Sequence, residues 1–259
     1  MLCPPSKVKR CIMYAKKYAK RQSYVEKVVA VLPHDHTAFT QGLAIDPDDP
    51  EIMYESTGLY GESSLRKVRW RTGEVVQMLQ GNGDGIPPTV FGEGLAVAND
   101  KLYMLTWKSN HAVVFDKQTL KKNGIEVYVT EGWGLAHDPI KNIFWMSDGS
   151  SKLFMRDGRT FDIINSIVVG VERMNELEIV TRDDGKRELW ANVWMTDTII
   201  RFDMDTMKQL EPIDLSWLAP DTPRDNNNVL NGIAQVDKDH VYVTGKRWPK
   251  AFLLNINKL

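Results

Sequence analysis

Short apolar runs recur along the chain from residue 25 onward, and turns rich in Gly, Asp, Asn and Pro separate them. Most runs are four to seven residues long and contain many Val, Ile, Leu and aromatic residues, which is typical of β-strands. They fall into groups of four. The predicted strands are residues 42–45, 52–56, 64–70 and 75–79; 94–97, 102–107, 112–115 and 125–129; 134–137, 143–147, 152–156 and 163–169; and 177–181, 189–194, 199–202 and 209–213.

A recurring motif opens each group, so the groups are repeats of one unit. Its copies are Phe-Thr-Gln-Gly-Leu-Ala (39–44), Phe-Gly-Glu-Gly-Leu-Ala (91–96), Glu-Gly-Trp-Gly-Leu-Ala (131–136), Met-Asn-Glu-Leu-Glu-Ile (174–179) and Leu-Asn-Gly-Ile-Ala (230–234). The equivalent positions Gly42, Gly94, Gly134, Glu176 and Gly232 are 52, 40, 42 and 56 residues apart, which is near the period of propeller blades.

The two ends of the chain complete each other. The fifth group has only three predicted strands, at 232–236, 240–243 and 251–256, and residues 25–32 form a single β-rich run ahead of the first motif. A blade that lacks its outer strand leaves an exposed edge, which this run could cover. We therefore predict an all-β fold, a five-bladed β-propeller whose last blade is closed by an N-terminal strand, as one domain over residues 25–259.

Charge divides the chain into two parts. The formal net charge is -1, but residues 1–22 carry seven basic side chains and no acidic one, which leaves 26 basic against 34 acidic residues for the rest. An acidic body argues against a nucleic-acid surface. We expect residues 1–24 to be a flexible basic extension.

Several other classes of protein lack support. The chain contains no run of about 18 apolar residues, the length that a membrane-spanning helix needs. Residues 1–22 lack the apolar region of a signal peptide, so the compartment stays open. Cys3 and Cys11 both precede the repeats, and whether they pair is open. The repeated body therefore contains no thiol or zinc cluster, and we expect a monomer that binds no nucleic acid and no membrane.

Inner strands of a propeller line its central channel, so the side chains around the motif and at the end of the following strand should meet at a channel mouth. This set combines aromatic walls with carboxylates, amides and one ammonium. It consists of Phe39, Gln41, Phe91, Glu93, Trp133, Met174, Asn175 and Asn231 from the motif, and Glu55, Trp107, Asp148, Trp194 and Lys246 from the second strand.

Other conspicuous residues have structural interpretations. Glu55 and Asp148 are expected to join strands, and Trp70, Trp145, Trp190 and Trp217 to pack between blades. His34 and His36 could ligate a metal from one strand face, but we expect them to lie in a solvated loop.

Nine stretches of the chain together carry a family resemblance. They are Phe-Thr-Gln-Gly-Leu (39–43), Glu-Ser-Thr-Gly-Leu-Tyr-Gly-Glu-Ser-Ser-Leu-Arg (55–66), Phe-Gly-Glu-Gly-Leu (91–95), Gly-Trp-Gly-Leu (132–135), Ser-Asp-Gly-Ser-Ser (147–151), Asn-Glu-Leu-Glu (175–178), Trp-Ala-Asn-Val-Trp (190–194), Leu-Asn-Gly-Ile-Ala (230–234) and Val-Thr-Gly-Lys-Arg-Trp-Pro (243–249). In this order they resemble the plant and bacterial type of glutaminyl-peptide cyclotransferase, or glutaminyl cyclase, and the resemblance covers residues 39–254. Met174 departs from the Leu that is more usual in that family.

The resemblance implies an enzyme that converts the N-terminal glutamine of peptides or proteins to pyroglutamate and releases ammonia. It implies that Glu93 shuttles the proton and that Lys246 stabilises the negative charge on the amide oxygen. Gln41 and Asn175 would hold the substrate. The aromatic walls would be Phe39, Phe91, Trp107, Trp133 and Trp194. No metal or other cofactor is expected in catalysis, although a structural Ca²⁺ ion could occupy the channel.

Two alternatives remain open at this stage. Glu93, Asn175 and Asn231 are oxygen ligands that Ca²⁺ at a propeller axis would accept, as in a calcium-dependent lactonase or esterase. A non-enzymatic propeller could instead bind peptides on the same face.

Overall fold

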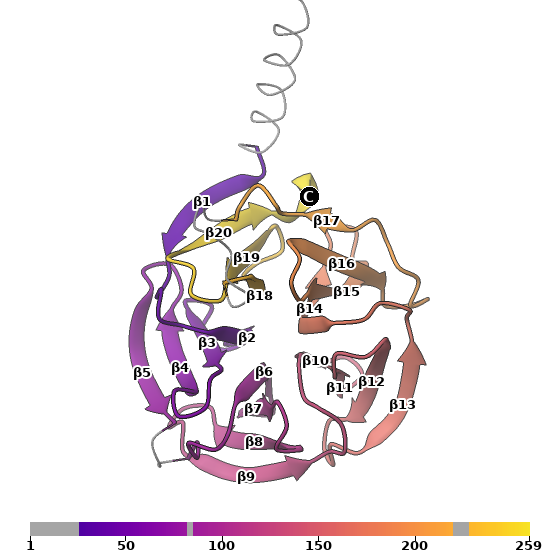
Figure 1. The fold of residues 1–259 in the computed structure, drawn as a ribbon. Coiled ribbons are helices and arrows are strands. Elements are labelled where there is room, and N and C mark those ends of the chain that lie inside the picture. The colour runs from indigo at the N-terminus through magenta and orange to yellow at the C-terminus, as the bar shows by residue number, and fades with distance from the viewer. Residues whose placement is uncertain (1–25, 82–84, 220–227) are drawn as a thin grey trace, which may run out of the picture.

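A computed structural model describes residues 26–81, 85–219 and 228–259, and within them five four-stranded antiparallel sheets surround a central axis (Figure 1). The first four blades run in chain order from the axis outward. Their strands are β2 (Thr40–Ile45), β3 (Ile52–Thr57), β4 (Ser64–Arg69) and β5 (Glu74–Gln80); β6 (Gly92–Ala98), β7 (Lys101–Thr106), β8 (His111–Asp116) and β9 (Lys122–Val127); β10 (Leu135–Asp138), β11 (Ile143–Ser147), β12 (Lys152–Asp157) and β13 (Ile163–Val168); and β14 (Met174–Thr181), β15 (Arg187–Val193), β16 (Thr198–Asp203) and β17 (Ile213–Asp214). The predicted five-bladed propeller is confirmed.

The fifth blade joins the two ends of the chain. Its inner strands are β18 (Leu230–Gln235), β19 (His240–Gly245) and β20 (Lys250–Asn255), and β1 (Val28–Pro33) pairs with β20 as the outer strand. The pairing is antiparallel and places Leu32 opposite Ala251. The predicted closure by an N-terminal strand is therefore correct, and the short 3-10 helix Ile256–Lys258 follows β20. The basic extension and both cysteines lie outside the described residues.

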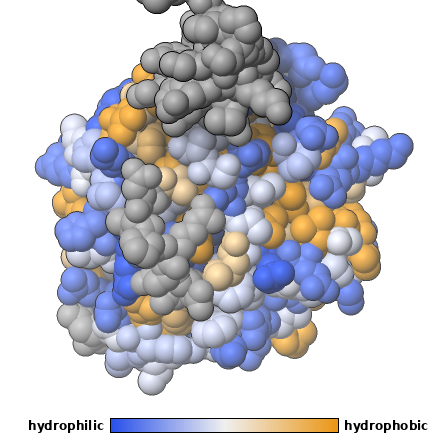
Figure 2. Space-filling model, turned by 45° about the horizontal axis from the view of Figure 1, so that its top comes forward, coloured by the Kyte–Doolittle hydropathy of each residue, from blue (hydrophilic) through white to orange (hydrophobic). Residues whose placement is uncertain are grey.

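Apolar side chains pack between neighbouring blades rather than in one central core. Trp70, Trp145 and Trp190 are buried in three different inter-blade clusters, as predicted, and the partly buried Trp217 packs against the cluster that contains Trp190. Exposed apolar residues such as Val76, Val127 and Val168 lie on or beside the outer strands. Figure 2 shows such apolar patches interrupted by hydrophilic surface. No helix in the described part of the chain is both long and apolar enough to cross a membrane.

One outer strand differs from its prediction. We expected a strand at 209–213 in the fourth blade, but β17 covers only Ile213 and Asp214, and Gln209 makes an isolated bridge with Phe202. Pro212 lies between them and has no backbone N–H to donate to a strand ladder, which explains the interruption. Outer strands bury little, so their limits follow less closely from the apolar pattern.

The inner strands approach each other closely at the axis, and the motif glycines permit this. A Cβ atom at Gly134 would lie 1.8 Å from the backbone oxygen of Asn175, and one at Gly42 would lie 2.3 Å from the backbone nitrogen of Leu95. In the fourth repeat Glu176 replaces the glycine. Its buried carboxylate accepts hydrogen bonds from the backbone amides of Ile233, at 3.0 Å, and Leu43, at 3.4 Å. Glu176 thus connects three blades across the channel.

Closure by β1 gives a test with a matched pair of variants. Leu32 packs against the cluster that contains Trp70 and Tyr242, whereas its neighbour Val31 is 54% exposed. Full burial of a Leu side chain contributes about 1.5 to 3 kcal/mol. Leu32 is partly buried, and Leu32→Asp also places a charge against the cluster, so it should lower Tm by roughly 5 °C. Val31→Asp should shift Tm by less than about 2 °C. Equal shifts in calorimetry would mean that β1 does not seal the ring.

Candidate active site

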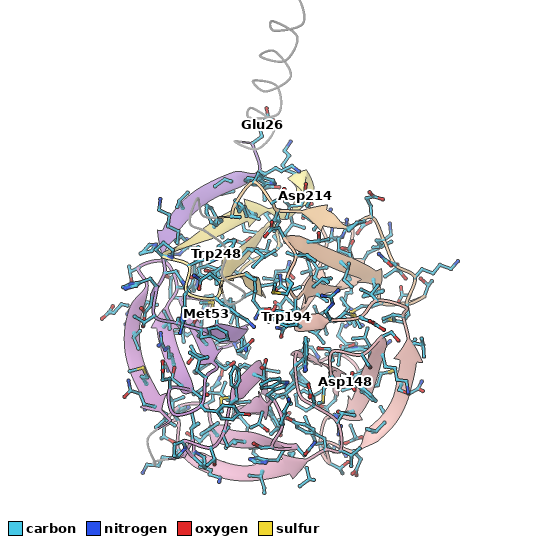
Figure 3. The ribbon with its side chains drawn as sticks, in the orientation of Figure 1. Glu26, Met53, Asp148, Trp194, Asp214 and Trp248 are labelled. Carbon is cyan, nitrogen blue, oxygen red and sulfur yellow. The ribbon has the colours of Figure 1, made fainter. Side chains whose placement is uncertain are left out.

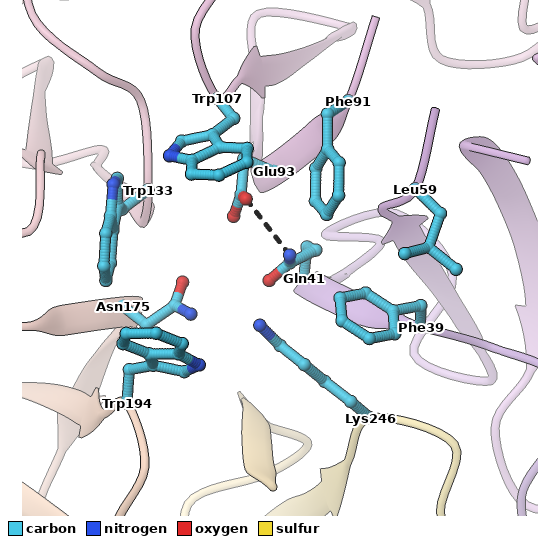
Figure 4. A pocket seen from close by; sticks show the side chains of 10 residues that line it. All are labelled: Phe39, Gln41, Leu59, Phe91, Glu93, Trp107, Trp133, Asn175, Trp194 and Lys246. Carbon is cyan, nitrogen blue, oxygen red and sulfur yellow. Dashed lines mark hydrogen bonds between the residues drawn. The ribbon is translucent and has the colours of Figure 1, made fainter. Parts of the chain in front are cut away.

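A pocket of about 240 Å³ opens at one end of the channel (Figure 4). An engineered cavity of roughly 150 Å³ in another protein already holds benzene, so this pocket has room for one amino-acid side chain of a ligand. The structure brings all nine predicted site residues into its lining, together with Leu59. The ten residues are Phe39, Gln41, Leu59, Phe91, Glu93, Trp107, Trp133, Asn175, Trp194 and Lys246.

Irregularities at the start of the inner strands aim the polar side chains at the pocket. The register of the ladder shifts between Thr40 and Gly42, between Gly92 and Leu95, and between Met174 and Leu177. Bulges of this kind redirect side chains and are frequent next to active sites. Gln41, Glu93 and Asn175 occupy these three shifts, so in three blades the motif turns one polar group toward the pocket; β18 carries the same shift around Asn231.

Aromatic rings form the walls of the pocket and pack edge to face. The ring centroids of Phe39 and Phe91 are 6.0 Å apart, those of Phe91 and Trp107 are 5.5 Å apart, and those of Trp133 and Trp194 are 5.9 Å apart. Figure 3 shows Trp194 beside the propeller axis. Because these rings offer little polar surface, a charge inside the pocket is poorly solvated.

Glu93 is the acidic group of the pocket and is only 6% exposed. Its Oε1 accepts a hydrogen bond from Nε2 of Gln41 at 3.1 Å, and its buried Oε2 has no hydrogen-bond partner among the described residues. Burial raises the pKa of Glu93 well above its ordinary value; the charge of Lys246 opposes this shift and that of Glu131 adds to it. Glu93 therefore holds a proton at pH values where an exposed glutamate has lost it.

Lys246 is the basic group and is only 3% exposed. It follows β19, and its ammonium points into the pocket toward Gln41, with Nζ 4.9 Å from the ring centroid of Phe39 (Figure 4). Burial lowers the pKa of Lys246 to about 8, against the opposing effect of the Glu93 charge. The pocket thus faces one acid and one ammonium whose pKa values are shifted toward each other.

The two predicted asparagines have different surroundings. Oδ1 of Asn175 is buried without a hydrogen-bond partner among the described residues, so it is available to a donor on a ligand. Nδ2 of Asn231 instead donates to the backbone oxygen of Thr40 at 3.0 Å and lies 3.4 Å from Oε1 of Gln41. Asn231 does not line the pocket; it contacts Gln41 and the backbone next to it from behind the lining residues.

Sequence reasoning missed Leu59. It lies in the loop after β3 with φ of +87°, an unfavourable value for a leucine, and its backbone oxygen accepts from the amides of Glu62 and Ser63. The preceding Gly58 leaves room for Phe91, since a Cβ atom there would lie 2.3 Å from its ring. Glycines at 58 and 61 mark a tight loop, but not which of its side chains faces the channel.

The prediction for His34 was wrong. His34 is buried, Nε2 lies 3.2 Å from Oε1 of Glu55, and Nδ1 lies 2.5 Å from the backbone oxygen of Trp248. Burial alone would lower the pKa of His34, but the hydrogen bond and charge of Glu55 raise it above its ordinary value. Glu55 also accepts from Thr40 at 2.7 Å, so it joins strands as predicted. The loop that carries His34 packs against the fifth blade at Trp248, a contact between distant segments that short-range sequence patterns do not reveal.

Asp148 has a structural role, but it caps a turn rather than joining strands as we expected. Its Oδ1 accepts hydrogen bonds from the backbone amide of Ser150, at 3.0 Å, and from its hydroxyl, at 2.5 Å. The carboxylate therefore caps the turn after β11 and does not line the pocket.

Fold and site together define a class of five-bladed propellers in which one buried carboxyl and one buried ammonium share an aromatic pocket at the channel mouth. Comparison with known proteins makes the class specific. The family model for glutamine cyclotransferase matches residues 6–256. A glutaminyl-peptide cyclotransferase from Arabidopsis thaliana is 38% identical over 242 residues, which cover 90% of this chain and 71% of that protein. The chain belongs to the glutamine cyclotransferase family.

A solved structure supports the same relationship. The crystal structure of Myxococcus xanthus glutaminyl cyclase superposes with a TM-score of 0.74 at 26% identity, and the match covers 88% of this chain and 94% of that one. The predicted family and the predicted fold are therefore both confirmed.

The electrostatic coupling in the pocket can be measured without a substrate. Because the Glu93 charge favours protonation of Lys246, Glu93→Gln should lower the Lys246 pKa below about 8. Nitrogen-15 NMR of labelled lysine, with Lys246→Arg to assign the signal, would report the titration of Lys246 in the wild type and in Glu93→Gln. A Lys246 midpoint at or above the ordinary 10.5 in the wild-type protein would contradict the described burial.

Proposed function

We propose that in this glutaminyl-peptide cyclotransferase Glu93 transfers the proton and Lys246 stabilises the developing oxyanion. The single observation that carries the proposal is the meeting of these two buried groups in one aromatic pocket of about 240 Å³. Titratable groups with shifted pKa values in a cleft are frequent at catalytic sites.

The reaction occurs within one substrate residue. The lone pair of the α-amine attacks Cδ of the side-chain carboxamide and forms a new C–N bond. The bond between Cδ and Nε2 then breaks, and Nε2 leaves as ammonia after it receives the proton that the amine has lost. Since nucleophile and electrophile are already joined, the enzyme has to supply conformation, proton transfer and charge stabilisation.

Glu93 suits the proton transfer because it must first accept a proton and then donate it. A carboxyl with an ordinary pKa is a weak acid catalyst at neutral pH, whereas one with a raised pKa can serve in both directions. Its Oε1 is held by Gln41, and its Oε2 is free of partners among the described residues. We assign Oε2 to the substrate.

Lys246 suits the role of charge stabiliser. With a pKa of about 8 the ammonium is mostly protonated at neutral pH, and in a poorly solvated pocket its attraction for an oxyanion is stronger than in water. As the tetrahedral centre forms, charge moves onto the amide oxygen. We place that oxygen within reach of Nζ.

The remaining lining residues orient the glutaminyl residue. Oδ1 of Asn175 can accept from an N–H group of the substrate, and Gln41 can contact the carboxamide. The walls from Phe39 to Trp194 exclude water, which favours cyclisation over hydrolysis of the amide. The partners that follow are peptides or proteins with a free N-terminal glutamine. The monomeric state stays a prediction.

The calcium-dependent alternative needs a different use of the same residues. Within the part of the chain that the structure describes, no group of three or more His, Cys, Asp or Glu residues is placed to hold a metal. Asn231, one of the three ligands considered for that alternative, does not line the pocket with Glu93 and Asn175. A structural Ca²⁺ in the channel stays compatible with the proposed mechanism. Activity that disappears with a chelator and returns with Ca²⁺ would favour the alternative.

The proposed activity is tested by incubating a Gln-Xaa peptide with the protein and following ammonia release and the matching mass loss. Glu93→Gln keeps the shape of the side chain but cannot carry the proton, so turnover should fall about 10² to 10⁴-fold. The same peptide with an acetylated amine is the substrate control. Turnover no faster than the spontaneous reaction would reject the proposal and would favour a non-enzymatic peptide-binding propeller, whereas full turnover in Glu93→Gln would remove Glu93 from the mechanism.

The lowered pKa of Lys246 predicts where kcat falls on the alkaline side of its pH profile. As pH rises through about 8 the ammonium loses its proton, so kcat should fall. Lys246→Arg keeps its charge to higher pH and should move this limb upward. Lys246→Ala should lower kcat about 100-fold or more while KM changes less. An unchanged kcat in Lys246→Ala would remove this residue from the mechanism.

A further inference from the structure

Glu131 connects two walls of the pocket from outside. Its Oε2 accepts a hydrogen bond from Nε1 of Trp107 at 2.7 Å and another from Nε1 of Trp133 at 3.0 Å. Trp107 follows β7 in the second blade and Trp133 precedes β10 in the third, so one carboxylate oxygen holds indoles of neighbouring blades. Glu131 does not line the pocket, and its side chain is 40% exposed.

These bonds decide which side of each indole the substrate meets. In Figure 4 the ring nitrogens of Trp107 and Trp133 are turned away from Gln41 and Lys246. The pocket therefore presents carbon edges and faces of both rings, and the donors that face it come from other residues, such as Nζ of Lys246 and the ring nitrogen of Trp194 (Figure 4). An indole N–H released from Glu131 could turn toward the substrate carboxamide and compete with Lys246 for its oxygen.

The backbone around Glu131 is fixed well enough to position its carboxylate. The amide of Gly132 donates to the backbone oxygen of Trp107 at 3.0 Å, and a Cβ atom at Gly132 would lie 2.3 Å from Oη of Tyr128. Lys108 lies over the Trp107 ring at 4.0 Å from its centroid, with Nζ 3.8 Å from Oε1 of Glu131. This exposed ion pair is weak in itself but occupies the second carboxylate oxygen.

We infer that Glu131 is a positioning residue of this site: it keeps the indole N–H groups of Trp107 and Trp133 outside the pocket and so preserves an apolar wall for the glutaminyl side chain. This inference rests on the proposed function, because the wall matters through the substrate that it orients. Hydrogen bonds to a charged acceptor are stronger than those between neutral groups, and two of them converge on this carboxylate and hold both rings.

The charge of Glu131 has a second, separable effect. It raises the pKa of Glu93, whereas the charge of Lys246 lowers it, and the phenol of Tyr128 is also close enough to be influenced by Glu93. A neutral residue at 131 should therefore allow Glu93 to ionise at lower pH. Position and charge can be separated, since glutamine retains an acceptor oxygen but no charge.

The test compares Glu131→Gln with Glu131→Ala in the full chain. In Glu131→Gln the acidic limb of the kcat/KM profile should move to lower pH while KM stays within about twofold. In Glu131→Ala the same shift should appear together with a KM increase of about tenfold and altered tryptophan fluorescence of the substrate-free protein. Asp203→Asn removes a carboxylate that caps the turn at Thr206 in the fourth blade and does not line the pocket; it should match the wild type in all three readouts.

The outcomes are distinct from those that test the activity itself. A wild-type protein without ammonia release refutes the proposed function. An active wild type together with an unchanged acidic limb in Glu131→Gln and an unchanged KM and fluorescence in Glu131→Ala refutes the role of Glu131. A lowered Tm in Glu131→Ala with no shift of the acidic limb in either variant would likewise contradict it, since a merely structural role moves stability alone.

Discussion

The removal of water from the Glu93 carboxyl is the constraint on which the site depends. An exposed glutamate opposite a lysine would form an ordinary ion pair, with both groups charged at neutral pH. Here aromatic walls penalise both charges, so the pKa of Glu93 rises while that of Lys246 falls to about 8. Glu93 can then both accept and donate a proton, and Lys246 can keep its charge, in the range where the proposed chemistry takes place. The same burial strengthens any charge interaction that a substrate makes.

The propeller creates this environment by repetition with small departures. Four inner strands carry a register shift at the same motif position. In three of them it turns one polar residue, Gln41, Glu93 or Asn175, toward one pocket, and in β18 it holds Asn231. The glycine of the motif lets the inner strands approach each other at the axis. In the fourth blade Glu176 replaces this glycine, and its carboxyl group spans the channel. Function therefore resides in the differences among repeats, while their shared pattern provides the ring.

The sequence was sufficient for the blades and the first layer of the site because both leave local marks. Strand runs, the motif and the family resemblance together located five sheets and nine lining residues. What they could not locate depends on contacts between distant segments: Leu59 faces the pocket through an unusual backbone angle, His34 is buried under the fifth blade, and Glu131 gains its meaning only when two indoles from different blades meet it. The prediction of a strand at 209–213 was wrong for a local reason: Pro212 has no backbone N–H to donate, which the pattern of apolar residues does not show.

The central claim is that burial keeps a proton on Glu93 beyond the range of an ordinary glutamate. Carbon-13 NMR of the side-chain carboxyl carbons, with Glu93→Gln to identify the signal, measures this directly. We expect the Glu93 resonance to titrate at a midpoint well above 4.5. A midpoint at or below 4.5 would contradict the account, because the carboxyl would then be an ordinary, fully ionised group at neutral pH.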